Sequence, residues 1–522
     1  MNSQLLIESI RKNNNMEIIA KDNKISIDEL KKILIESIQL NPPRPKKETI
    51  PEPKEETVSE EEYDTDNDED VYDRIIRKSP IKLTEEQIEF LDLAVKQRKN
   101  ILLAASAGYG KSASIATAIQ LFQHIFKQHS KMYFSKKYGS YSNPDELALC
   151  STYGLCASTG RASSLIKGRT LHSYFGIGIG KGNVDDWVQR VRTAIYLRDT
   201  YNNLRAVQVI VIDEVSMISD VLLDKISEYL QKLRKCDKPF GGVQMIFIGD
   251  MAQLSPVEND FMFKSTEYKA AKVQTHTLTK CFRQNDPILL NILNEIRLGH
   301  CSDESFQILK AQTSIDEEYS QGLKPMRIVA TNSEVDVINN RELMEVCKQG
   351  GLAPVSFPIK YTDSNTKKAD AYRKADMIPE DVKLVVGAQI VVMHNISRSI
   401  VNGSQGIVTE IKSNEVIVNL IDIGEVTIGY FGYKDPEHND IYSAKTLFQY
   451  MPLRLGFAST VHRIQGMSLK LIEVDLSKVF CSGQTYTALS RAHSLQGIIV
   501  KGLKSKKVFI CDPSVKRFLA IK

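Results

Sequence analysis

Short apolar runs alternate with stretches of helical periodicity over most of the chain after residue 81. The run at 100–105 precedes helical character from Ser114 to Lys127, and further apolar runs stand at 209–212 and 245–248. Strands buried on both faces have apolar residues at consecutive positions, and their alternation with helices predicts parallel sheets covered by helices. The pattern therefore predicts the α/β fold class.

Residues 381–422 break this rhythm. They hold short β-rich runs at 382–386, 389–392, 406–411 and 416–421, separated by turn residues such as Asn402-Gly403. Runs of this length joined by turns predict a small β-barrel inserted in the α/β fold. The helical rhythm resumes near Leu453.

The N-terminal region differs from the rest of the chain. Apolar residues at helical spacing predict an amphipathic helix over 27–40, with Ser26 and Glu29 as a capping box. Such a helix suits packing on the main body and binding of a partner equally. Residues 42–79 are proline-rich and then acidic, which predicts a disordered linker. Binding of a protein partner through the acidic N-terminal region is a further possibility.

Charge and cysteine usage narrow the function classes. The formal net charge is +4, although residues 48–73 carry thirteen acidic residues and one lysine, so the remainder is strongly basic. A basic body suits a polyanionic partner, with ordinary surface solubility as the alternative. No apolar run reaches membrane-spanning length, the start is not typical of a signal peptide, and eight cysteines form no Cys-x-x-Cys pair. We expect an intracellular, reducing compartment, with no zinc site and no membrane.

The segment between the first strand and its helix has the chemistry of a phosphate-binding loop. Gly108 and Gly110 let the backbone turn its N–H groups toward phosphates, Lys111 can reach the outer phosphates, and the Ser112 hydroxyl can ligate Mg²⁺. Ala105 stands where the strict pattern has glycine, so a simple glycine turn before a helix is the alternative. The predicted phosphate-binding residues are Ala105, Ser106, Ala107, Gly108, Tyr109, Gly110, Lys111 and Ser112.

A second acidic segment, about a hundred residues later, completes the prediction. Val209-Ile-Val-Ile-Asp-Glu214 ends a β-branched run in two carboxylates, at the strand end where ligands bind in parallel sheets. Asp213 would hold Mg²⁺, and Glu214 would orient and deprotonate a water molecule. The alternative is a solvated acidic turn. Together the two segments predict a hydrolase of nucleoside triphosphates.

Further segments resemble the motifs of superfamily 1B DNA helicases of the petite-integration-frequency (PIF) type, which are related to RecD-type helicases. The resemblance covers about Lys82 to Leu519, with the motifs in the family's order. The matching segments are Leu83-Thr-Glu-Glu-Gln87, Ala157-Ser-Thr-Gly160, Thr170-Leu-His-Ser-Tyr-Phe-Gly176, Gly249-Asp-Met-Ala-Gln-Leu-Ser-Pro-Val257, Cys281-Phe-Arg-Gln284, Ala458-Ser-Thr-Val-His-Arg-Ile-Gln-Gly466 and Thr487-Ala-Leu-Ser-Arg-Ala492.

The resemblance implies roles at the nucleotide. Gln87 would bond adenine, with a capping box formed with Thr84 as the alternative, and Gln253 would sense the γ-phosphate. Arg283 and Arg491 stand at the family's arginine-finger positions, where a guanidinium bonds two phosphoryl oxygens. Two further residues, Gln465 and Gly466, would lie beside the nucleotide.

The resemblance also implies contacts to a DNA strand. Hydroxyl and imidazole groups would bond phosphates and an aromatic ring would support or stack on a base, although a histidine among aromatics is as often a packed core residue. The residues concerned are Thr159, His172, Ser173, Phe175, Thr460 and His462.

Two RecA-like lobes with parallel sheets follow from the resemblance, with an inserted SH3-like β-barrel. The expected boundaries are 1–41 for the helical segment, 42–79 for the linker, 80–272 for lobe 1, 273–345 with 446–522 for lobe 2, and 346–445 for the insert. Residues 128–149 are expected to be an added surface loop.

The implied activity is an ATP- and Mg²⁺-dependent DNA helicase that travels 5′→3′ on single-stranded DNA and opens duplex junctions. One alternative is a RecD-type subunit of a larger complex, and another is a DNA-stimulated ATPase that remodels without separating strands.

Overall fold

The structure is a computed structural model. It describes residues 68–79, 81–106, 108–137, 153–166, 168–178, 180–194, 197–256, 258–282, 286–362, 366–375, 378–397, 399–434, 445–479 and 481–520. The predicted helix over 27–40, and the predicted linker as far as residue 67, lie outside the described residues.

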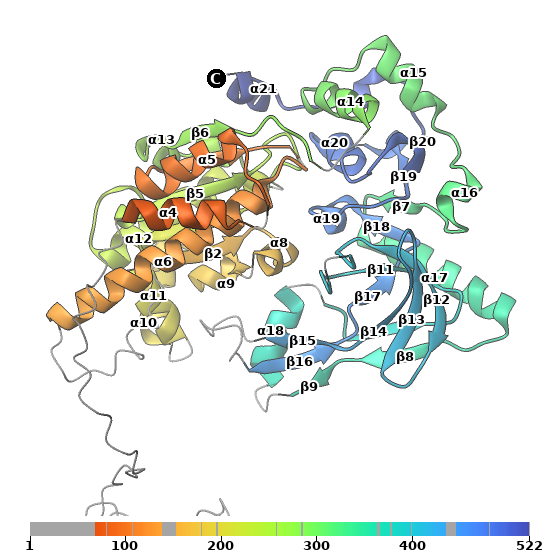
Figure 1. Cartoon of the computed structure of the whole chain (residues 1–522), viewed down its shortest axis with the longest axis horizontal. Coiled ribbons are helices and arrows are strands. Elements are labelled where there is room, and N and C mark those ends of the chain that lie inside the picture. The colour runs from red at the N-terminus through yellow and green to blue at the C-terminus, as the bar shows by residue number, and fades with distance from the viewer. Residues whose placement is uncertain are drawn as a thin grey trace, which may run out of the picture. The chain divides into compact units, whose positions relative to one another are not determined.

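A six-stranded sheet, parallel throughout, forms the first part of the fold (Figure 1). In order across the sheet its strands are β3 (Arg169–Thr170), β2 (Tyr153–Ala157), β4 (Val209–Asp213), β5 (Gln244–Gly249), β1 (Ile101–Ala104) and β6 (Gln274–Thr277). The strands β4, β5 and β1 are therefore neighbours, and the loops that follow them meet at one edge of the sheet.

Both faces of this sheet are buried, which explains the consecutive apolar positions. Along β4, Val209 and Val211 enter one core, while Ile210 and Ile212 enter the other. One core includes residues of α5 (Glu85–Leu91) and α6 (Lys111–Lys137), and the other includes residues of α10 (Val184–Thr193) and α12 (Asp220–Arg234).

A second parallel sheet has four strands. Their order is β18 (Ala458–Thr460), β7 (Met326–Val329), β19 (Ile472–Asp475) and β20 (Ile498–Lys501). The helices associated with this part are α14 (Pro287–Arg297), α15 (Asp303–Ala311), α17 (Asn332–Gly350), α19 (Val461–Ile464) and α20 (Gln484–Leu489). Two parallel sheets with helices confirm the predicted α/β class.

Antiparallel sheets occupy the region where the helical rhythm breaks. A five-stranded sheet runs in the order β14 (Gly424–Gly429), β13 (Glu415–Leu420), β12 (Gln405–Ile411), β11 (Gln389–Val392) and β17 (Leu453–Leu455). Smaller sheets pair β15 (Phe431–Lys434), β16 (Thr446–Tyr450) and β9 (Lys360–Tyr361), and β10 (Asp381–Leu384) with β8 (Val355–Pro358). Strands form at all four of the predicted β-rich runs.

The strand pairings move two predicted boundaries. Strand β6 pairs with β1, so the first sheet continues beyond residue 272 to Thr277. Strands β16 and β17 pair with β9 and β11, so the inserted sheets continue beyond residue 445 to Leu455. Both errors come from short strands, whose partners are remote in sequence and leave no local signal.

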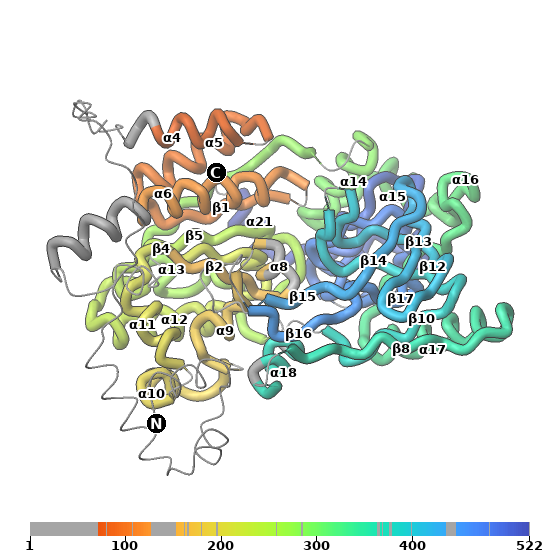
Figure 2. Tube along the Cα trace, turned by 60° about the horizontal axis from the view of Figure 1, so that its bottom comes forward, coloured from red at the N-terminus to blue at the C-terminus, as the bar shows by residue number. Residues whose placement is uncertain are grey.

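Two segments predicted to be irregular are helical. Helix α4 (Asp68–Arg77) occupies the end of the predicted linker and lies beside α5 and α6 in both views (Figures 1 and 2). Its Val71 and Tyr72 are buried, and the Tyr72 hydroxyl donates to Asp92 Oδ1 at 2.7 Å. Helix α6 starts at Lys111 and continues to Lys137, into the predicted loop at 128–149. For α4, the acidic composition of the segment predicted disorder, although its few apolar residues are enough to form a buried helix face.

Candidate nucleotide site between the two parallel sheets

The predicted phosphate loop stands between β1 and α6. Gly108 and Gly110 adopt φ values of 88° and 82°, a left-handed conformation that favours glycine. The Lys111 ammonium donates to the carbonyl oxygens of Ala105 at 2.7 Å and Ser106 at 2.9 Å, so it lies within the curve of its own loop. Ala107 lies outside the described residues. A curled loop with an ammonium at its centre and a helix start behind it suits phosphate groups.

The predicted carboxylate pair lies at the end of β4. Glu214 has a φ of 51°, and its N–H donates to Asp213 Oδ1 at 2.8 Å. Burial, and then the Glu214 carboxylate, raise the pKa of Asp213, against the opposing effects of the Glu214 N–H and Lys111. The strained backbone at Glu214 holds two carboxylates together in a desolvated place, which favours a cation beside them.

The donor set suits Mg²⁺ held together with phosphates. Within the described part of the chain, no group of three or more His, Cys, Asp or Glu side chains could hold a metal ion. Asp213 and the exposed Ser112 hydroxyl at the start of α6 offer two oxygen ligands. Mg²⁺ commonly takes one or two protein oxygens and completes its shell with water and substrate phosphates.

Gln253 and Gln465 meet at the Glu214 carboxylate. Gln465 follows α19, and its Nε2 donates to Glu214 Oε2 at 3.0 Å and to Gln253 Oε1 at 3.4 Å. Both glutamine side chains are buried. Residues of the two parallel-sheet parts thus contact one another at the predicted water-activating carboxylate. The structure gives Gln465 a protein partner there, whereas the sequence predicted only a place beside the nucleotide.

The two predicted arginine fingers differ in what the structure shows. Arg491 is 1 % exposed, and its guanidinium donates to the Thr487 carbonyl at 3.0 Å and to Ser490 Oγ at 2.8 Å. Burial lowers the pKa of Arg491, and the Glu214 carboxylate opposes that shift.

Arg283 itself lies outside the described residues. The N–H of its neighbour Phe282 donates to the Gly108 carbonyl at 2.8 Å, which brings this segment to the phosphate loop.

Gln87 forms the capping box that the sequence left as the alternative. Its Oε1 accepts from the Thr84 N–H at 2.9 Å, and its Nε2 donates to the Gly110 carbonyl at 3.1 Å. The side chain is 2 % exposed. Both ends of the amide are therefore engaged by protein, and Gln87 supports the phosphate loop from behind.

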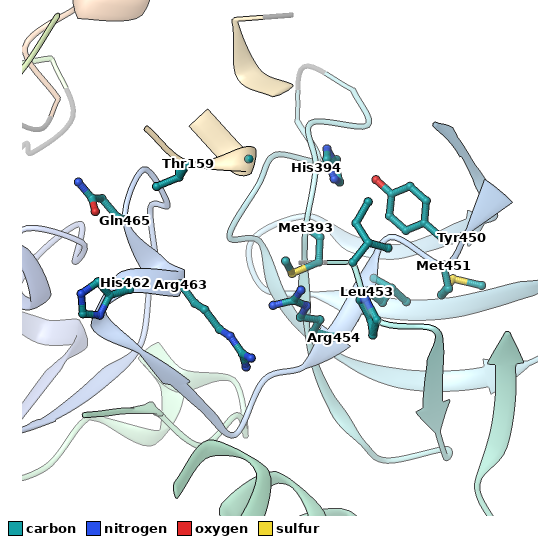
Figure 3. A pocket seen from close by; sticks show the side chains of 13 residues that line it. Thr159, Met393, His394, Tyr450, Met451, Leu453, Arg454, His462, Arg463 and Gln465 are labelled. Atoms are coloured by element: carbon teal, nitrogen blue, oxygen red, sulfur yellow. The ribbon is translucent and has the colours of Figure 1, made fainter. Parts of the chain in front are cut away.

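Some of the residues predicted to contact DNA line a pocket between the two parallel-sheet parts and the insert (Figure 3). Thr159, His462 and Gln465 lie on its wall, opposite His394 and Tyr450 of the inserted region. Burial lowers the pKa of His462, so its ring is neutral at neutral pH.

Two arginines that were not among the predicted DNA contacts also line this pocket, Arg454 and Arg463. Burial, with the nearby Arg463, lowers the pKa of Arg454 to about 10, so Arg454 remains cationic at neutral pH. The matching segment 458–466 contains Arg463, which was the available signal.

The other predicted DNA contacts lie elsewhere. Phe175 has no exposed surface and packs in the core, so its predicted stacking on a base is wrong, and a supporting role is what burial permits. Thr460 is buried and caps α19 by accepting from the Arg463 N–H. Ser173 Oγ accepts from Arg169 at 3.2 Å, and burial lowers the pKa of the half-buried His172.

Comparisons with known proteins agree with this geometry. The family model described as PIF1-like helicase matches residues 152–305. The human protein named ATP-dependent DNA helicase PIF1 is 32 % identical over 453 residues, which is 84 % of this chain and 64 % of that protein. The Pif1 helicase of Bdellovibrio bacteriovorus is 29 % identical over 445 residues, which is 84 % of this chain and 92 % of that protein. The chain thus spans less than two-thirds of the human relative.

Solved structures show the same fold. The crystal structure of Pif1 helicase from Candida albicans superposes with a TM-score of 0.63 at 26 % identity, covering 84 % of this chain and 99 % of that one. Pif1 from Bacteroides in complex with ADP-AlF4 gives 0.65 at 25 % identity, covering 84 % and 97 %. In sequence and in fold the chain is thus similar to PIF1-like helicases over most of its length.

Proposed function

We propose that this protein is an ATP-dependent DNA helicase, which travels on single-stranded DNA and unwinds duplex DNA. The supporting relatives include the human ATP-dependent DNA helicase PIF1 and a Bacteroides Pif1 structure bound to single-stranded DNA, which is 26 % identical with a TM-score of 0.54. The 5′→3′ direction is proposed from the family resemblance alone.

One observation carries the proposal. The short segment 460–466 lines the pocket beside the insert through His462 and Arg463, and contacts the catalytic carboxylate through Gln465. A DNA strand bound in that pocket would therefore touch the segment whose Gln465 bonds Glu214. The segment gives a direct physical route by which DNA stimulates ATP hydrolysis.

At the nucleotide, this chain's own residues supply most of the chemistry. The loop amides and Lys111 bind the phosphates, and Lys111 exchanges its two carbonyl partners for phosphate oxygens. Glu214 takes a proton from the attacking water, with one carboxylate oxygen held by Gln465 and the other facing the water. Arg491 stabilises the charge that develops on the transferred phosphoryl group. Mg²⁺, held by Ser112 and Asp213, would supply further positive charge when it is bound.

The two parallel-sheet parts would move relative to one another because the γ-phosphate of bound ATP bridges them. Bound ATP lets cations of the second part reach phosphates held by the first, and hydrolysis removes that bridge. If each part holds the strand by its phosphates, alternate grip becomes stepwise motion.

A strand-displacement assay on a 5′-tailed duplex tests the proposal, with a 3′-tailed duplex as the matched substrate. We expect ATP-dependent displacement of the 5′-tailed substrate only, and none with Lys111→Ala. ATP hydrolysis stimulated by DNA without displacement of either substrate would favour the remodelling ATPase instead. Displacement that appears only after a second protein is added would favour the RecD-type subunit.

A further inference from the structure

Two buried side chains, Asp250 and Tyr486, and the partly buried Arg297 join the two parallel-sheet parts behind the phosphate loop. Asp250 follows β5 and has no exposed surface. Arg297, the last residue of α14, donates to its Oδ1 from Nε at 3.1 Å and from Nη2 at 2.9 Å. Tyr486 of α20 donates to its Oδ2 at 2.7 Å, and the Ala252 N–H donates to Oδ1 at 3.2 Å. The carboxylate is thus fully bonded, by donors from both parts.

Tyr486 also reaches the phosphate loop itself. Its hydroxyl donates to Asp250, and burial raises the pKa of Tyr486 while the nearby Ser106 side chain of the loop opposes that shift. One phenol therefore contacts the loop that would hold the phosphates and the carboxylate that anchors α14. No motif prediction assigned this residue a role.

The backbone of α20 is equally close to the first part. Gly483, which precedes the helix, has a φ of 75°, and a Cβ built there would lie 2.2 Å from the Gln253 carbonyl oxygen and 2.6 Å from that of Ala252. Such an approach excludes any side chain. The helix is therefore seated on the loop after β5 by backbone as well as side-chain contacts.

Arg491 follows the other end of the same helix. Its guanidinium is bonded to Thr487 and Ser490, and it is attracted by the Glu214 carboxylate. Because these bonds tie the guanidinium to its own segment, the seating of α20 decides where Arg491 stands relative to Glu214.

We propose that Tyr486 is a positioning residue for ATP hydrolysis. Together with Asp250 and Arg297 it seats α20 so that Arg491 is aligned with phosphates held by the loop. Tyr486 acts through Arg491 and takes no part in bond making. The inference rests on the proposed hydrolysis of ATP and adds a residue to the same site.

Tyr486→Phe removes the hydroxyl and leaves the ring to fill the core. We expect kcat for DNA-stimulated ATP hydrolysis to fall roughly 10- to 100-fold, the range that a small misplacement of a reacting group costs. KM for ATP and the Kd for single-stranded DNA should change less than about twofold, because the groups that bind them are untouched. Tyr229→Phe is the matched control, since this buried hydroxyl also donates one bond, to the Phe175 carbonyl at 3.3 Å, and its kcat should stay at the wild-type value.

A double-mutant cycle separates positioning from general damage. If Tyr486 acts through Arg491, Tyr486→Phe should cause little further loss of single-turnover rate in an Arg491→Ala background. Equal loss factors in both backgrounds, or a wild-type kcat in Tyr486→Phe, would overturn the inference. Thermal unfolding and DNA binding check that each variant folds, and Arg491→Lys replaces Arg491→Ala if the latter does not. A wild-type protein that hydrolyses no ATP would overturn the proposed function instead.

Discussion

Replacing Arg297 by methionine should show how much one buried ion pair holds the two parts together. The substitution keeps an unbranched side chain of similar length and removes the guanidinium, whose Nε and Nη2 donate to Asp250. The carboxylate keeps its bonds from Tyr486 and the Ala252 N–H, but it loses its counter-charge in a place with no exposed surface.

The magnitude follows from the burial of both partners. The Asp250 side chain is 0 % exposed and that of Arg297 is 17 % exposed. Removing one partner of a buried pair costs about 3–5 kcal/mol of unfolding free energy, because the other charge stays buried and uncompensated. Since two donors remain on Asp250, we expect the lower end, about 3 kcal/mol.

The cost should depend on pH in a defined direction. Burial pushes the pKa of Asp250 upward, but Arg297 and the hydrogen bonds hold it below its ordinary value. A carboxyl with a lowered folded-state pKa contributes stability above its unfolded pKa, about 3.9, and loses it as pH falls through the folded value. In Arg297→Met the pKa of Asp250 rises, so protonation relieves the unpaired charge, and the penalty at about pH 7.5 should shrink toward about pH 5.

Urea unfolding at the two pH values measures this, with Lys232→Met as the matched control. Lys232 pairs with Asp185 at 2.7 Å with both side chains exposed, where a pair contributes about 0–1 kcal/mol. The double variant Asp250→Asn with Arg297→Met should recover much of the loss, because no charge is then buried alone. A penalty under about 1 kcal/mol at neutral pH, or one equal at both pH values, would refute the argument from an uncompensated buried charge.

Other predictions concern the site itself. Lys111→Ala should abolish DNA-stimulated ATP hydrolysis in a coupled-enzyme assay and leave single-strand binding within about twofold, since no residue of the phosphate loop lines the pocket; wild-type turnover would contradict the site. Arg491→Ala should bind ATP but hydrolyse it about 10³-fold or more slowly in single-turnover measurements, and unchanged turnover would remove the finger assignment. Gly483→Ala should lower kcat and thermal stability together, because a Cβ would meet the Gln253 carbonyl at 2.2 Å; a variant equal to wild type in both would show that α20 can move away. Single-strand affinity should fall steeply as salt rises in fluorescence titrations, because cationic contacts release counterions from the strand, and a flat titration would argue against phosphate binding.

The sequence was sufficient wherever a feature depends on neighbouring residues. The apolar runs at 209–212 and 245–248 appear as β4 and β5, because burial on both faces makes each position apolar. The glycines at 108 and 110 adopt the left-handed backbone that a phosphate loop requires. The helix at 68–77 was missed, because its two buried residues stand within a strongly acidic stretch.

Contacts between remote segments could not be predicted in the same way. Asp250 is one residue of a recognised motif, but its two partners are remote in sequence. Arg297 ends a helix and Tyr486 precedes another motif, and no spacing along the chain links them to Asp250. Gln87 shows both kinds of contact. Its capping box with Thr84 is local and was predicted as an alternative, whereas its bond to the Gly110 carbonyl forms only because folding brings the phosphate loop near. A carboxylate at the end of a buried strand was a local signal for Asp250, as it was for Asp213.

Two of the connections between the parallel-sheet parts differ in strength, and this difference bears on how the parts can move. Gln465 to Glu214 is a single bond to a charged group, of a kind worth about 1.5–3 kcal/mol net. Asp250 with Arg297 and Tyr486 is a buried charge with four donors, whose disruption would expose or strand ions at a cost of several kcal/mol. A nucleotide that rearranges the site can replace the first at small net cost, because phosphate or water offers Gln465 and Glu214 new partners. The Asp250, Arg297 and Tyr486 contacts have no replacement partners in their buried surroundings, so we expect them to persist through the cycle of ATP binding and hydrolysis. Movement should therefore be least at α20 and β5 and greatest toward the pocket lined by His462, where the strand would be held.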